Sequence, residues 1–129
     1  LPTNKESIFY LNILDIPPNS PEDEGKNALK FAMQNRIKLF YRPVGVASVN
    51  KETFKKLRVN NSSNGLVIKN GSANWVTISD VKANSVKVNY ETIMIAPQES
   101  QRVDVKNHNA NSWQLTIIDD HGNYISEKL

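Results

Sequence analysis

The sequence contains no cysteine, so the chain has no disulfide, no thiolate metal ligand and no cysteine nucleophile. This absence does not identify a compartment, because oxidising compartments also contain cysteine-free domains. No apolar run approaches the roughly 20 residues of a membrane-spanning helix, and the first residues lack the basic and then apolar segments of a signal peptide. We therefore expect no membrane insertion, and a chain that is soluble or already processed.

Histidine and glycine are also scarce, which weighs against catalysis. The two histidines, His108 and His121, lie in turn-like contexts rich in Asn or Asp, and no G-x-S-x-G motif accompanies them. His121 follows Asp119 and Asp120, but one His beside two adjacent acids lacks the spacing of known metal sites. The five glycines form neither G-x-G-x-x-G nor a P-loop. We expect no enzyme activity, no metal and no cofactor.

The length of 129 residues fits one ordinary domain or two small ones, and 39% hydrophobic with 22% charged residues is typical of a globular chain. Charge is unevenly distributed. Residues 1–25 contain one Lys and five acidic residues, residues 26–58 contain nine Lys and Arg with one Glu, and residues 59–129 contain six basic and seven acidic residues. The basic third is compatible with binding of nucleic acid, an anionic membrane surface or a carboxylate, and also with the solvated face of an amphipathic element.

Two apolar segments occupy the first third of the chain. Residues 8–16 are β-branched, aromatic and Leu residues before a Pro-Pro pair, which predicts a buried strand, and residues 19–25 form a polar loop. Residues 28–42 fit a long strand better than a helix, because a helix would expose Phe31 and Leu39. In a strand, the Lys and Arg residues share one face and only Phe40 is misplaced. The opposite face carries the bulky side chains of Leu29, Phe31, Met33, Ile37, Leu39 and Tyr41. Because aromatic and basic groups then lie on opposite faces, we do not expect nucleic-acid binding.

The rest of the chain predicts short strands separated by turns. Residues 44–48 have the composition of a linker. Strands are expected at residues 52–59, 65–69, 75–79, 86–88, 91–96, 101–105 and 113–118. Turns are expected at the Asn70-Gly71-Ser72 segment and at residues 119–122. This rhythm predicts an antiparallel β-sandwich over residues 49–129.

Two linked motifs carry a family resemblance. Residues 6–18 read ESIFYLNILDIPP, and residues 29–43 read LKFAMQNRIKLFYRP. Together they closely resemble the signature of the PapD-like periplasmic fimbrial (pilus) chaperones, and residues 65–70 and 120–122 resemble the second domain more loosely. The resemblance implies an all-β fold. It would comprise an immunoglobulin-like β-sandwich at residues 49–129, a linker at residues 44–48, and a β-hairpin at residues 1–43 from an incomplete N-terminal immunoglobulin-like domain.

The resemblance also implies a function, donor-strand complementation, in which a chaperone strand completes a pilin subunit that lacks its own last strand. Leu29, Phe31 and Met33 lie at alternate positions and would enter the subunit, where each buried large side chain contributes about 1.5–3 kcal/mol. Lys38 matches the family's anchoring Lys and would bind the C-terminal carboxylate of the subunit. The implied location is the periplasm, and the implied partners are fimbrial subunits and an outer-membrane usher.

Three further residues match family positions that form an ionic contact between the two domains: Glu6, Arg42 and Asp120. The family also begins with strands that have no counterpart in this sequence, including one that contributes an Arg to the carboxylate site. We therefore expect the chain to be a fragment whose exposed hairpin pairs with a second copy as a homodimer. The competing hypothesis is a non-chaperone immunoglobulin-like adhesion or binding module.

Overall fold

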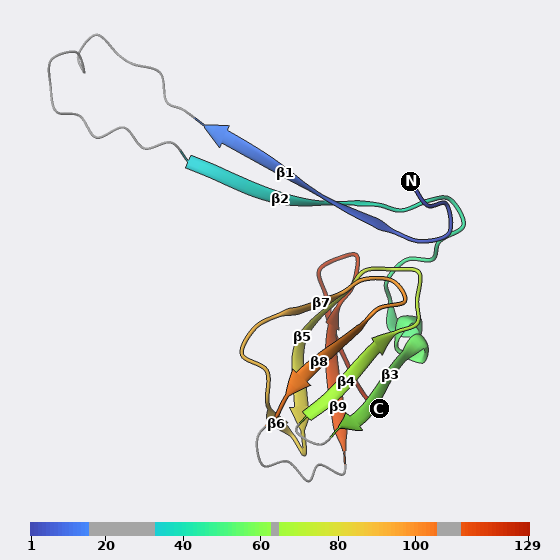
Figure 1. Ribbon diagram of the computed structural model, residues 1–129, viewed down its shortest axis with the longest axis vertical. Helices are drawn as coiled ribbons and strands as arrows, with labels where there is room; N and C mark the ends of the chain where they lie inside the picture. The colour runs from blue at the N-terminus through green and yellow to red at the C-terminus, as the bar shows by residue number, and fades with distance from the viewer. Residues whose placement is uncertain (16–32, 63–64, 106–111) are drawn as a thin grey trace, which may run out of the picture. The chain divides into compact units, whose positions relative to one another are not determined.

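The computed structural model describes residues 1–15, 33–62, 65–105 and 112–129 (Figure 1). Its described regular structure consists of β-strands and one short 3₁₀ helix. The chain forms two compact units. The hairpin unit is residues Ile8–Tyr41, and the sandwich unit is residues Leu1–Ser7 together with Arg42–Leu129. Leu29, Phe31 and His108 lie outside the described residues.

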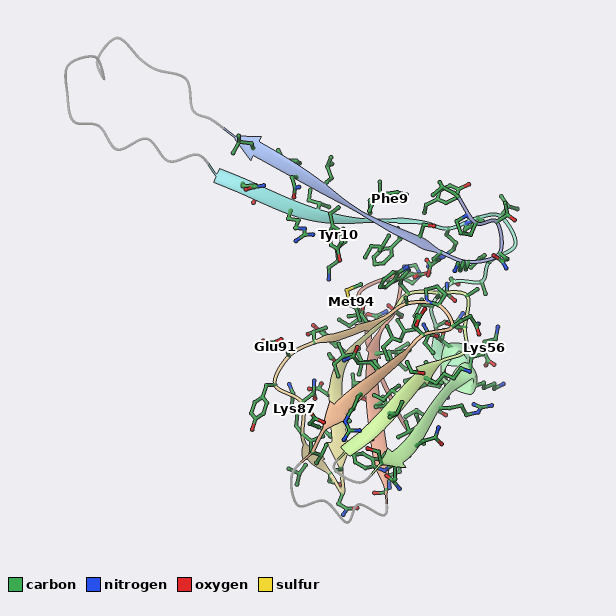
Figure 2. The ribbon with its side chains drawn as sticks, in the orientation of Figure 1. Phe9, Tyr10, Lys56, Lys87, Glu91 and Met94 are labelled. Atoms are coloured by element: carbon green, nitrogen blue, oxygen red, sulfur yellow. The ribbon has the colours of Figure 1, made fainter. Side chains whose placement is uncertain are left out.

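The hairpin unit contains two strands, β1 (Ser7–Asp15) and β2 (Met33–Tyr41), which pair in a two-stranded antiparallel sheet (Figure 1). The long strand expected at residues 28–42 is thus described from Met33 onward. Alternation along a strand places successive side chains on opposite faces, and Phe9 and Tyr10 leave opposite faces in Figure 2.

The two faces of the hairpin differ in chemistry. One, termed the apolar face, carries six large and exposed side chains: Phe9, Leu11, Ile13, Ile37, Leu39 and Tyr41. The other, termed the basic face, carries Tyr10, Arg36 and Lys38 near its middle. Two strands alone bury little area, so the described residues of the hairpin unit leave this apolar face exposed.

The sandwich unit contains a 3₁₀ helix, η2 (Lys51–Lys56), and two antiparallel sheets (Figure 1). The first sheet has the order β3-β4-β8, with strands Leu57–Ser62, Gly65–Asn70 and Ser100–Asp104. The second has the order β10-β9-β5-β6, with strands Tyr124–Lys128, Trp113–Ile118, Val76–Ala83 and Val86–Lys87, and β7 (Ile93–Ile95) also pairs with β5. The buried core draws on both sheets, with Leu66, Ile68, Val76, Ile78, Leu115 and Ile117 at its centre.

A β-bulge in β5 keeps its apolar side chains on the core side. The partners of Ile78 and Asp80 on β9 are adjacent residues, Ile117 and Thr116, so β5 has one extra residue at this point. Ile78 before the bulge and Val81 after it are therefore both fully buried, although three positions separate them. On the other edge of β5, the buried Asn89 side chain accepts a hydrogen bond from the Val81 amide at 2.7 Å and donates to the Ser79 carbonyl at 2.9 Å.

Two expectations about the elements are corrected. Residues 52–59 were expected to form a strand, but residues 51–56 form η2, because Asn50 caps this segment. The Asn50 side chain accepts from the Glu52 amide at 2.8 Å, and the Asn50 amide donates to the Thr53 hydroxyl at 3.1 Å. Strand β10 was not expected, and it pairs with β9 along its whole length.

Asn70 ends β4 with its carboxamide fully buried. The segment after it does not close a hairpin, because β4 and the next strand, β5, belong to different sheets. The Asn70 amide group donates to the carbonyls of Asn74, Ile95 and Ala96 at 2.7, 3.0 and 3.2 Å. Its oxygen accepts from the Ser72 amide and hydroxyl at 3.0 and 2.5 Å. One side chain therefore fixes the crossing between the sheets.

We predict that Asn70→Ala lowers the free energy of unfolding by about 2–4 kcal/mol, because several buried polar groups lose their partner at once. Urea unfolding followed by circular dichroism measures this loss. Asn60→Ala, at an exposed position of β3, is the matched control and should change stability by less than about 0.5 kcal/mol. Equal stability of the two variants would contradict the role of Asn70.

Candidate functional site

The turn between β9 and β10 positions the Asp120 side chain for its contact with Arg42. The Asp119 carboxylate accepts hydrogen bonds from the amides of His121 and Asn123 at 2.9 and 2.8 Å, and these bonds lower the pKa of Asp119. Gly122 adopts a φ of +80°, in the left-handed region that favours glycine. The residues of the expected turn at 119–122 thus form a tight turn from which the Asp120 side chain projects.

Arg42 joins two carboxylates from distant parts of the sequence. Its terminal nitrogens donate to both oxygens of Asp120 at 2.6 and 2.8 Å, which is a bidentate pair. Its Nε donates to the Glu6 carboxylate at 3.1 Å. The structure therefore brings together Glu6, Arg42 and Asp120, the three residues singled out by the resemblance, and all three belong to the sandwich unit.

Glu6 is the most buried member of this contact, with only 2% of its side chain exposed. Its second oxygen accepts from the Trp75 amide at 2.8 Å, and its own amide donates to the Ala73 carbonyl at 2.8 Å. A buried carboxylate is stable only with such partners, because desolvation is costly. The segment before β1 is thereby tied to the loop between β4 and β5.

Electrostatics in the contact favour the charged forms. The hydrogen bonds from Arg42 lower the pKa of Asp120, against the opposing effect of burial, and the Val49 amide adds a further bond to this carboxylate at 3.2 Å. The bonds to Asp120 in turn raise the pKa of Arg42. Arg42 and Asp120 are therefore both ionised near neutral pH.

The expected subunit-binding residues lie on β2 or before it. Met33 begins β2, while Leu29 and Phe31 precede the described part of the strand. Lys38 lies in the middle of β2 and is exposed. The Arg36 guanidinium lies over the Tyr10 ring, 3.9 Å from the ring centre, on the face that Lys38 shares by alternation. The sequence pattern did not single out this pair.

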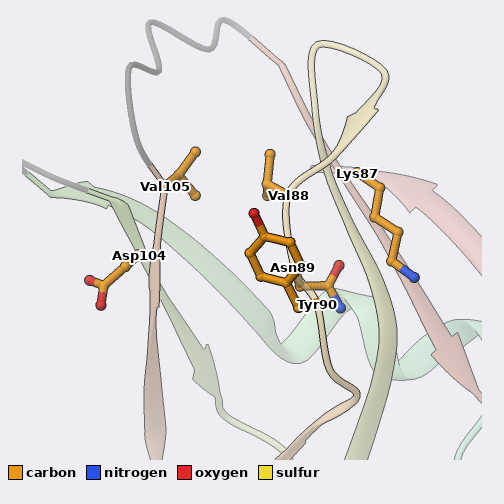
Figure 3. Close-up of a pocket in the computed structure, with 6 residues that line it drawn as sticks. All are labelled: Lys87, Val88, Asn89, Tyr90, Asp104 and Val105. Carbon is orange, nitrogen blue, oxygen red and sulfur yellow. The ribbon is translucent and has the colours of Figure 1, made fainter.

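A separate hollow of about 520 Å³ lies between the β6–β7 segment and the end of β8. Its lining includes Lys87, Val88, Asn89, Tyr90, Asp104 and Val105, with the Tyr90 ring between the Lys87 and Asp104 sides (Figure 3). The charged groups at its rim are paired within the chain, since Lys87 contacts Asp80 at 2.8 Å and Arg102 contacts Asp104 at 2.9 Å.

Neither a metal centre nor a membrane span is found in the part of the chain that the structure describes. Within residues 1–15, 33–62, 65–105 and 112–129, no three His, Asp or Glu side chains gather as metal ligands do. In the same residues, no helix has the length and apolar character required to cross a bilayer.

The described architecture is that of an immunoglobulin-like β-sandwich with a β-hairpin, and sequence comparison identifies its class. Residues 1–47 match the family described as pili and flagellar-assembly chaperone, PapD N-terminal domain. Residues 52–129 match the family described as pili assembly chaperone PapD, C-terminal domain. The chain therefore belongs to the PapD family of pili assembly chaperones. Glu6 and Arg42 lie in the first matched segment and Asp120 in the second.

Individual relatives are similar over the whole chain. It is 84% identical over 129 residues to the probable fimbrial chaperone YehC of Escherichia coli (strain K12), covering 54% of that protein. It is 36% identical over 126 residues to the chaperone protein PapD of Escherichia coli, covering 51% of it. The crystal structure of the YadV chaperone superposes on 100% of this chain and 64% of its own, with a TM-score of 0.74 and 31% identity. The chain spans about half the length of the curated relatives it matches.

We predict that Asp120→Asn lowers the free energy of unfolding at pH 7 by about 1–3 kcal/mol and makes stability less dependent on acid. The pKa of Asp120 is lower in the folded chain than in the unfolded chain. Its contribution is therefore complete above the unfolded pKa of about 3.9 and is lost as the pH falls through the folded pKa.

Urea unfolding at pH 7 and near pH 3 measures both effects. The stability difference between the variant and the unchanged chain should shrink at the lower pH. Asp104→Asn removes the same charge from a side chain that is 81% exposed and is the control. A difference that stays constant with pH would contradict the contribution of Asp120.

Proposed function

We propose that this protein is a periplasmic chaperone that captures fimbrial subunits by donor-strand complementation and delivers them to an outer-membrane usher. The observation that carries the proposal is the β1–β2 hairpin in a chain of the PapD family, with β2 a strand that has only one neighbour among the described strands. A strand with one neighbour presents unpaired backbone groups along its other edge, which is the template that strand addition requires.

Leu29, Phe31 and Met33 are proposed to fill the groove of the subunit. They occupy alternate positions, so that all three project from one face of an extended strand. Apolar side chains at alternate positions supply affinity through burial, while the backbone hydrogen bonds of the added strand fix its register. Lys38 is proposed to bind the C-terminal carboxylate of the subunit in a charge-assisted contact.

The Glu6–Arg42–Asp120 contact is proposed to set the orientation of the two domains, taken as residues 1–43 and residues 49–129 with a linker at residues 44–48. This role is supported by the two matched family segments, because the three residues are drawn from both. The Asn74 side chain also donates to the Ala47 carbonyl at 2.6 Å, within the proposed linker. A linker fixed by such contacts would keep the second domain in a defined orientation while the first domain binds the subunit.

The proposed role is binding without catalysis. The family is one of assembly chaperones, and a chaperone of this kind needs complementary surfaces and no reacting group. A plain immunoglobulin-like adhesion module would share the sandwich. It would have no need of the hairpin, whose apolar face exposes side chains as large as Leu39.

The same hairpin is proposed to mediate self-association of the 129-residue chain. The apolar face and the unpaired strand edges both lower their free energy when another strand covers them. A second copy of the chain offers an identical hairpin, and a symmetric dimer would pair the two.

We predict that Phe31→Asp in the full-length gene product lowers capture of a fimbrial subunit by about 10- to 100-fold, because a charge replaces an apolar side chain that the subunit buries. Co-purification of the chaperone with the subunit measures this. Gln34→Asp introduces the same charge on the opposite face and should retain capture. Undiminished capture by the Phe31 variant, with the fold intact by circular dichroism, would contradict donor-strand binding.

We predict that the purified 129-residue chain is a dimer in solution. Multi-angle light scattering gives the mass directly, to be compared with 14.6 kDa for one chain. Replacing Leu11 and Leu39 on the apolar face by Lys should return the mass to that of a monomer, since like charges then oppose pairing. A monodisperse monomer with an ordered hairpin would overturn the prediction.

A further inference from the structure

Arg36 is held in place by an aromatic ring on the neighbouring strand. Its guanidinium carbon lies 3.9 Å from the centre of the Tyr10 ring, well within the range of a cation–π contact. Both residues belong to the hairpin unit, Tyr10 on β1 and Arg36 on β2. The stacked arrangement restricts a long side chain that would otherwise sample many rotamers in solvent.

The nitrogen atoms of Arg36 pair with no acidic group in the described part of the hairpin. Among residues 1–15 and 33–62, the Arg36 guanidinium forms no ion pair, in contrast to Arg42, which pairs with Glu6 and with Asp120 in the turn after β9. Stacking occupies the face of the guanidinium and leaves the N–H groups at its edge able to donate. Within residues 1–15 and 33–62, the basic face therefore presents an oriented donor that forms no ion pair.

Arg36 also lies two residues before Lys38, so both side chains project from the same face, about 7 Å apart along the strand. An anion that contacts both side chains would interact favourably with two positive charges. Strand β1 contains one acidic residue, Asp15, which is its last residue and lies five positions after Tyr10 in the sequence.

We propose that Arg36 is a further cationic contact for the subunit's C-terminal carboxylate, positioned by Tyr10 next to Lys38. The proposal rests on the proposed function, in which Lys38 binds that carboxylate. A planar guanidinium can donate two parallel N–H groups to one carboxylate, which an ammonium cannot do. Arg36 thus adds directionality to the point charge of Lys38, and Tyr10 reduces the ordering that binding requires.

The test compares two synthetic peptides with the sequence of the C-terminal strand of a fimbrial subunit, one ending in a carboxylate and one ending in an amide. Affinities for the full-length gene product are measured by isothermal titration calorimetry or fluorescence anisotropy. The quantity of interest is the ratio of the two affinities within each variant. Partial unfolding lowers both affinities together and leaves this ratio unchanged.

We predict that Arg36→Gln lowers the preference for the carboxylate peptide by about tenfold, and that Arg36→Lys retains part of it. Tyr10→Leu, which removes the ring but keeps an apolar residue, should lower the preference by about two- to fivefold. The preference should also become less sensitive to salt in Arg36→Gln, because one charge–charge contact is missing. Lys69→Gln, an exposed charge on β4 of the sandwich unit, is the matched control and should leave the preference unchanged.

The Lys38→Met variant distinguishes a failure of the Arg36 proposal from a failure of the proposed function. If Lys38→Met abolishes the carboxylate preference and Arg36→Gln does not alter it, the role of Arg36 is wrong and the proposed function stands. If Arg36→Gln weakens both peptides equally, Arg36 supports the strand and does not contact the carboxylate. If the unchanged protein binds neither peptide, or does not distinguish them, the proposed carboxylate site and the role of Arg36 both fall.

Discussion

The arrangement of the sandwich unit's connections depends on one guanidinium shared by two carboxylates. Arg42 follows β2 directly, and its planar group donates along two edges, to Glu6 through Nε and to Asp120 through both terminal nitrogens. Each carboxylate also accepts a backbone amide, from Trp75 for Glu6 and from Val49 for Asp120. The chain before β1, the chain after β2 and two loops of the sandwich thus converge on one side chain. A Lys at this position could not hold both acids in this geometry, because its charge has no fixed fork.

Burial gives this contact a different weight from the other ion pairs in the described chain. The Lys55–Glu52 pair on η2 is 2.6 Å long, but both side chains are about three-quarters exposed, and exposed pairs of this kind contribute little to stability. Glu6 is almost wholly removed from water. Removing its cationic partner would leave a buried charge, which costs about 3–5 kcal/mol. The contact is therefore stable only in a narrow range of geometries. For this reason it can hold the chain before β1 and the chain after β2 in one orientation relative to the sandwich loops.

The local pattern of apolar and polar residues was enough to predict strands such as β9 and β1. Strand β9 has the bounds expected for it, Trp113–Ile118, and β1 begins and ends one residue before its expected range. The pattern failed where side chains bond to the backbone, as Asn50 does at the start of η2. It also misread Asn70 as part of a tight turn, because burial of a carboxamide between two sheets depends on residues 25 positions away, such as Ile95.

The candidate site was predictable only in part, for a physical reason. Glu6 and Arg42 are 36 positions apart, and Arg42 and Asp120 are 78 apart. Three charged residues at such separations carry no periodic signal, so only a family resemblance could name them together. The Tyr10–Arg36 contact depends in the same way on the pairing of β1 with β2, which neither strand encodes alone.

The basic third of the sequence separates, in the structure, into charges with different uses. Arg42 pairs with the buried Glu6 and with Asp120, and Arg58 donates to the carbonyls of Lys55 and Leu57 at 2.7 and 3.0 Å. Both of these cations contact groups within the sandwich unit. Arg36 and Lys38 differ, because they lie on one face of a hairpin whose other face is apolar. The described part of this net positive block therefore includes both cations that contact groups of the sandwich unit and cations on the basic face of the hairpin.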